Sequence, residues 1–118
     1  MSYSTNPSLE KARGKAMKII TVCGSMKFIN QMMEIAVKTE LENNCLLLPI
    51  FSPTRTKKDD FTEEEVQILD KMHRERIKLS DAILVVNVNG YIGSSTKSEI
   101  EFAKSLNKEI IYYTDLVK

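Results

Sequence analysis

Glu99 is the residue whose type and position best suit covalent or electrostatic chemistry. Residues 94–96 are expected to cap a helix that runs to about Leu106, in which Ala103 follows Glu99 at i+4 on the side that faces a sheet. Its carboxylate is therefore expected near the first turn, where the helix dipole favours the ionised form of a nucleophile or electrostatic stabiliser. The alternative is a capping box from Thr96 to Glu99, in which Glu99 only accepts a hydrogen bond from the Thr96 backbone.

Two short loops rich in small residues, 24–27 and 89–96, precede predicted helices and are candidate anion sites. Helix N-termini present unpaired backbone N–H groups, small residues allow a phosphate to approach, and Lys27 would add a positive charge. Ordinary turns with Ser and Thr caps are the alternative. No three-glycine dinucleotide fingerprint or Walker A sequence is present. The candidate substrate- and phosphate-binding residues of the loops are Gly24, Ser25, Lys27, Asn89, Gly90, Tyr91, Gly93, Ser94 and Ser95.

His73 and Tyr91 each have two interpretations. His73 falls on the apolar stripe of a helix predicted over residues 63–79. It is either a core histidine or a group that faces the site and moves a proton. Tyr91 offers a ring for stacking on a base or sugar, or it packs down as a lid.

Four strands and three helices must position these residues. Apolar runs predict strands over residues 18–23, 45–48, 81–88 and 109–113, and helices alternate with them. This alternation predicts a three-layer α/β fold, a flavodoxin- or Rossmann-like parallel sheet of four or five strands in the order 2-1-3-4. The two candidate loops would then meet at the carboxyl ends of strands 1 and 3, while residues 50–61 form a long loop.

Composition limits the classes of function. The 118 residues suit one domain, expected over residues 17–118, with residues 1–16 an added leader or a disordered tail. A net charge of +1 argues against binding to a nucleic acid polymer, and no apolar run suits a membrane span. Cys23 and Cys45 fit buried thiols of a cytoplasmic protein, and one His removes most zinc motifs, so no metal site is expected.

Three segments carry a family resemblance. TVCGSMKF, SDAILVVNVNGYIG and STKSEIEFAKSLNKEIIYY resemble the nucleoside 2-deoxyribosyltransferase-like superfamily, closest to a subgroup of small proteins, over nearly all of residues 17–114. The similarity to deoxyribosyltransferases and 2′-deoxynucleoside 5′-monophosphate N-glycosidases is more distant. The resemblance implies that Glu99 attacks the anomeric carbon and that Gly93, Ser94 and Ser95 surround the 5′-phosphate. It also implies a homo-oligomer and no cofactor.

The sequence departs from that family at three points. His73 replaces an Asp near the sugar hydroxyls, Glu101 replaces a Gly, and only four strands are predicted where the transferases build five. The leading hypothesis is cleavage or transfer of the N-glycosidic bond of a nucleoside or nucleotide 5′-monophosphate, with Glu99 as nucleophile and His73 beside it. The alternative is a domain of the same fold that binds or senses a nucleotide derivative without cleaving it.

Overall fold

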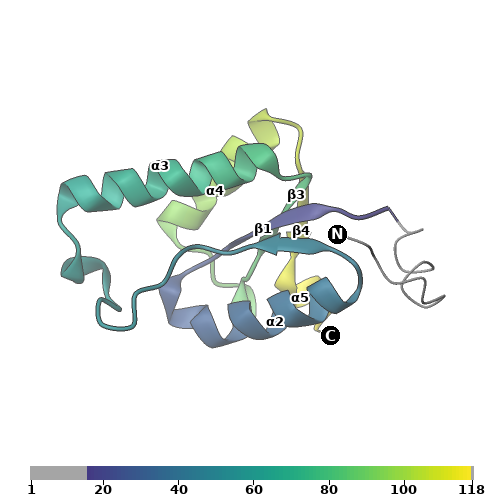
Figure 1. Cartoon of the computed structure of the whole chain (residues 1–118), viewed down its shortest axis with the longest axis horizontal. Helices are drawn as coiled ribbons and strands as arrows, with labels where there is room; N and C mark the ends of the chain where they lie inside the picture. The colour runs from purple at the N-terminus through teal and green to yellow at the C-terminus, as the bar shows by residue number, and fades with distance from the viewer. Residues whose placement is uncertain (1–15, 118) are drawn as a thin grey trace, which may run out of the picture.

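The computed structural model describes residues 16–117, so all but the last residue of the expected leader lies outside the described part. Its chain alternates between strands and helices as predicted (Figure 1). The strands and helices are β1 (Ile19–Cys23), α2 (Ile29–Leu41), β2 (Cys45–Leu47), α3 (Glu63–Leu79), β3 (Ala82–Val85), α4 (Ser94–Ser105), β4 (Glu109–Tyr112) and α5 (Tyr113–Leu116). Short 3-10 segments are η1 (Met26–Phe28), η2 (Lys58–Asp60) and η3 (Val88–Gly90).

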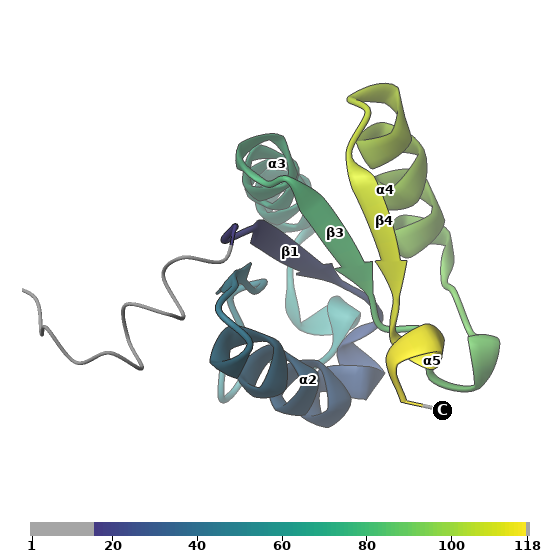
Figure 2. The same cartoon turned by 90° about the vertical axis from the view of Figure 1, so that its right-hand side faces the viewer.

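The four strands form one parallel sheet in the predicted order, β2-β1-β3-β4. The register pairs Ile20 with Ala82 and Cys23 with Val85, so β1 and β3 end side by side. Helices α3 and α4 cover one face of the sheet, and α2 and α5 lie on the other (Figure 2). The predicted three-layer α/β class is therefore confirmed.

The pleat of the central strands sends alternate side chains into two apolar clusters. Ile20, Val22 and Leu84 pack on the α2 face, while Cys23 and Val85 pack on the α3 and α4 face. Every residue of β3 is buried, as expected for a parallel strand covered on both sides. Cys23 is the last residue of β1, so the pleat places its thiol under the two helices that carry His73 and Glu99.

The ends of the helices follow local chemistry. Thr62 begins α3 through a reciprocal capping box with Glu65, and the helix has the bounds that the sequence predicts. Asn43 and Asn107 have positive φ values of 75° and 58°, the left-handed conformation that ends α2 and α4. The third strand is shorter than predicted, because residues 88–90 turn into η3. Among the described residues, none of the helices is long and apolar enough to cross a membrane.

Candidate functional site

A cavity of about 520 Å³ opens at the carboxyl ends of β1 and β3. This is the edge at which parallel α/β sheets bind ligands, because the loops diverge there. The sequence-predicted residues that line the cavity are Gly24, Ser25, His73, Tyr91, Gly93, Ser94, Ser95 and Glu99. Lys27, Asn89 and Gly90 do not line it.

Gly24 allows the first loop to pass close to β3. A Cβ atom at this position would lie 3.2 Å from the Val86 carbonyl oxygen and 3.3 Å from the Val86 Cβ. Both contacts are closer than ordinary van der Waals contact, so the backbone of Gly24 or Val86 would have to shift to accommodate a side chain. The small residue therefore lets the loop with Ser25 reach the cavity wall.

Lys27 is engaged with aromatic rings. Its Nζ lies 3.5 Å from the centre of the Tyr91 ring and 5.4 Å from that of Phe28. The two rings meet edge to face at 5.8 Å. The predicted cation of the first loop thus stabilises the position of Tyr91, which lines the cavity. Asn89 and Gly90 form the tight turn before it, with φ values of 54° and 80°.

The N-terminus of α4 has free hydrogen-bond donors. Gly93 is the N-cap and provides no side-chain cap, and the first helical bond runs from the Lys97 N–H to the Gly93 carbonyl. The N–H groups of Ser94 and Ser95 therefore have no partner within the helix, and both residues line the cavity. The expected side-chain cap at residues 94–96 is wrong, because these residues are already helical.

Glu99 is not a capping residue. Thr96 lies inside α4 and is buried, so the capping-box alternative is wrong. The Glu99 side chain is 12% exposed and lies on the sheet side of the helix, where its Oε1 lies 3.6 Å from His73 Nε2. His73 Nε2 also lies 3.4 Å from Cys23 Sγ. Three elements, β1, α3 and α4, thus bring Cys23, His73 and Glu99 together; His73 and Glu99 line the cavity, and Cys23 is fully buried.

Burial sets the ionisation of this cluster. It raises the pKa of Glu99 to about 7, against a weaker lowering by the hydrogen bond with Cys23. It lowers the pKa of His73 to about 4, with Arg76 adding to the effect. The pKa of Cys23 is raised by burial and by the nearby Glu99. Desolvation thus opposes the stabilisation of the Glu99 carboxylate that was expected from the helix dipole, and the pKa of Glu99 lies above its usual value.

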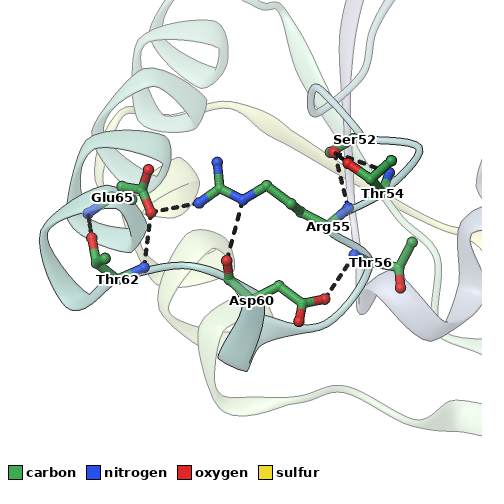
Figure 3. Close-up of polar contacts among 7 residues, drawn as sticks. All are labelled: Ser52, Thr54, Arg55, Thr56, Asp60, Thr62 and Glu65. Carbon is green, nitrogen blue, oxygen red and sulfur yellow. Dashed lines mark hydrogen bonds and ion pairs between the residues drawn. The ribbon is translucent and has the colours of Figure 1, made fainter.

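One wall of the cavity is formed by residues 49–61 and the first half of α3, and none of these residues is predicted from the sequence to belong to the site. This wall contributes Phe51, Lys57, Phe61, Val66, Leu69 and Asp70, among others. Figure 3 shows what orders it: Arg55 donates to the Glu65 carboxylate and, at 3.2 Å, to the Asp60 carbonyl. The Asp60 carboxylate accepts from the Thr56 and Lys57 N–H groups at 3.0 and 2.9 Å. The length of this loop was the available signal.

Comparison with models of known protein families, with curated proteins and with solved structures finds no match to this chain. The resemblance to the deoxyribosyltransferase-like superfamily therefore stays a prediction, and the functional argument depends on the geometry of the cavity.

Proposed function

We propose that this chain binds a nucleoside 5′-monophosphate in the cavity and cleaves or transfers its N-glycosidic bond with Glu99. The observation that carries the proposal is that one cavity contains the Glu99 carboxyl and the uncapped N-terminus of α4. The carboxyl suits attack on an anomeric carbon, and the helix N-terminus suits a phosphate.

The cavity has the size and chemistry that such a ligand needs. Its volume of about 520 Å³ lies within the range typical of small-molecule sites. Phe51, Phe61 and Tyr91 offer apolar rings against which a base can pack, and Lys57 and Arg76 add positive charge. A nucleotide is thus favoured over an uncharged nucleoside.

The reaction would follow the logic of a retaining glycosidase. The ionised Glu99 oxygen forms a bond to the anomeric carbon while the bond from that carbon to the base breaks. The base leaves with the electron pair of that bond and takes up a proton from solvent water. Water or a second base then displaces the sugar from Glu99, which gives hydrolysis or transfer. A pKa of about 7 leaves a substantial ionised fraction of Glu99 at neutral pH.

The direct experiment is incubation with each deoxynucleoside monophosphate, followed by chromatographic detection of free base. Glu99→Gln should abolish release, because an amide cannot form the glycosyl intermediate. Glu101→Gln is the matched control, since Glu101 lies on the same helix with its side chain 77% exposed. Full activity in Glu99→Gln would remove Glu99 from the chemistry.

A binding function without cleavage is the second candidate. The favouring observation is that the Glu99 carboxyl already has polar neighbours, since its Oε1 lies 3.6 Å from His73 Nε2 and within 4.8 Å of Cys23 Sγ. A nucleotide that raises the free energy of unfolding by about 2.7 kcal/mol at a hundredfold excess over Kd, without base release, would select this function.

The proposed assembly is a homo-oligomer. Met33, Val37 and Leu41 follow one another at four-residue spacing on α2 and are 52%, 61% and 84% exposed. An apolar stripe of this kind on an outer helix is typical of a surface that a second copy covers.

A further inference from the structure

Three different metal-ligating atoms lie close together in the side chains of Cys23, His73 and Glu99. Cys23 Sγ lies 3.4 Å from His73 Nε2, Glu99 Oε1 lies 3.6 Å from the same nitrogen, and the three ligand atoms are all within 4.8 Å of one another. Ligand atoms of a tetrahedral zinc site lie about 3.3–3.5 Å apart, since Zn–S is about 2.3 Å and Zn–N and Zn–O about 2.0 Å. The 3.4 Å separation of Cys23 Sγ and His73 Nε2 lies within this range, and the 3.6 Å separation of Glu99 Oε1 and His73 Nε2 lies just outside it.

A catalytic triad does not explain the cluster. In a triad the base meets the nucleophile through one ring nitrogen and the orienting carboxylate through the other. Here both the thiol and the carboxyl face Nε2, and His73 Nδ1 is buried with no hydrogen-bond partner. Glu99 therefore does not orient the ring for attack by Cys23.

The charges of the cluster suit a divalent cation. A thiolate and a carboxylate with a neutral imidazole carry a charge of −2, which a divalent ion balances within a site where all three side chains are at most 12% exposed. In the metal-free protein the contact between Glu99 and His73 is too long for a good hydrogen bond. Cys23 Sγ and His73 Nε2 are within hydrogen-bond distance of each other at 3.4 Å, so a bound cation would replace that bond and give the Glu99 oxygen a closer partner.

We propose that Cys23, His73 and Glu99 bind one thiophilic divalent cation, Zn²⁺ by preference, through Sγ, Nε2 and Oε1. Thiolate and imidazole select zinc-like ions over Mg²⁺ and Ca²⁺. His73 and Glu99 line the cavity, so the fourth coordination position faces it and takes water or a ligand.

The site has one consequence that rests on the proposed function. A Glu99 oxygen bound to the cation cannot attack a sugar, so the metal-loaded form is inactive in glycosyl chemistry. The two claims are tested separately, because metal binding is measured without a nucleotide and base release is measured after the protein has been treated with a chelator.

The experiment is titration of the chelator-treated full chain with Co²⁺ and Zn²⁺. We expect one Co²⁺ per chain with a thiolate-to-cobalt charge-transfer band in the near ultraviolet, and Zn²⁺ displacing it. Cys45→Ser is the matched control, since Cys45 is the other cysteine of the chain and lies in β2. It should keep the band, while Cys23→Ala should lose it. Glu99→Gln should weaken Zn²⁺ binding more than about a hundredfold, because partners outside the coordination sphere alone change affinity ~10–100-fold.

The outcomes are decisive even where a variant fails to fold. Circular dichroism identifies a misfolded Cys23→Ala, and Glu99→Gln, which leaves the packing of β1 unchanged, then supplies the comparison. Absence of a charge-transfer band in wild type, loss of the band in Cys45→Ser, or equal affinity for Mg²⁺ and Zn²⁺ would each overturn the proposal.

Discussion

Glu99 and His73 lie 3.6 Å apart, and burial moves their pKa values in opposite directions. The same desolvation disfavours the carboxylate and the imidazolium, so both side chains are neutral in the metal-free protein near pH 5.5. Each group then ionises more easily in the unfolded chain than in the folded one. Stability should therefore depend on pH through these two residues with opposite signs.

We expect the stability that Glu99 contributes to fall as the pH rises. Its folded pKa of about 7 exceeds the usual 4.5, so this contribution is complete below pH 4.5 and is lost as the pH rises through about 7. The measured quantity is the free energy of unfolding of wild type minus that of Glu99→Gln. Between pH 5 and pH 8 this difference should fall by up to about 3 kcal/mol, since a pKa difference of one corresponds to about 1.4 kcal/mol. Urea unfolding with chelator at pH 5 and pH 8 measures it.

The sign for His73 is opposite, and Glu101 provides the control. The contribution of His73 to stability is complete above pH 6.5 and is lost as the pH falls through about 4. The Glu99→Gln variant, which lacks the opposing contribution of Glu99, should therefore become more stable as the pH rises toward 6.5. Glu101→Gln should show the same pH dependence as wild type. A difference between wild type and Glu99→Gln that stays constant from pH 5 to pH 8 would contradict the assignment.

The residue cluster shows where sequence reasoning stopped. Helical spacing singles out Glu99 and His73, whereas the sequence indicates a buried thiol at Cys23 without placing it beside them. Its role depends on the pleat of β1 and on how α3 and α4 pack, because 50 residues separate Cys23 from His73. Zinc motifs with short spacing are visible in a sequence, whereas ligands from three separate elements are not.

At the scale of elements, the N-terminus of α4 differs from its prediction in a way that favours ligand binding. The helix begins one residue earlier than a Ser cap would allow, with the backbone of Gly93 extended at a ψ of 170°. The donors that a serine side chain would have capped are left to face the cavity. Ser94 and Ser95 therefore present backbone N–H groups as well as hydroxyls.

Ser95→Asp should discriminate between phosphorylated and unphosphorylated ligands. A carboxylate at this helix N-terminus would compete with a phosphate for the same N–H groups and repel it. We expect affinity for a nucleoside monophosphate to fall about three- to tenfold while affinity for the matching nucleoside is unchanged. Calorimetric titration of both ligands measures this, and equal losses for the two would mean that the phosphate lies elsewhere.

The segment of residues 49–61 behaves as an element although it has little regular structure. Sequence periodicity located the strands and helices because their apolar spacing repeats, and the Thr62 capping box fixed the start of α3. The segment has no such period, so its fold depends on specific polar contacts. Those contacts centre on Arg55, which joins the Asp60 carbonyl to the Glu65 carboxylate (Figure 3).

Arg55→Ala should loosen this wall without unfolding the sheet. The Arg55 and Glu65 side chains are 41% and 42% exposed, so the loss in global stability should stay below about 1 kcal/mol. Hydrogen exchange of residues 52–61 should become faster, and nucleotide affinity should fall. Lys78→Ala, which removes an exposed ion pair with Glu75 on α3, is the control and should change neither. Unchanged exchange in Arg55→Ala would show that apolar packing alone orders the wall.

At the scale of the whole molecule, the topology explains why distant residues share one site. The order β2-β1-β3-β4 makes the chain leave β1 and β3 toward opposite faces, so the two loops separate and open the cavity between them. The alternation of strands and helices predicted this edge. It did not predict the depth of the cavity, because that depends on the side chains of the irregular wall.

The exposed stripe of α2 gives a prediction about assembly. Met33, Val37 and Leu41 lie on the opposite side of α2 from the core residues Met32 and Ile35, and their burial between two copies would remove apolar surface from water. We expect wild type to sediment as a dimer or larger species and Val37→Lys to shift toward monomer, because a charge at the centre of the stripe is costly to bury. Ile68→Lys is the control, since Ile68 is 59% exposed on α3 across the sheet. It should leave the mass unchanged, whereas a wild-type chain that stays monomeric at every concentration would contradict the prediction.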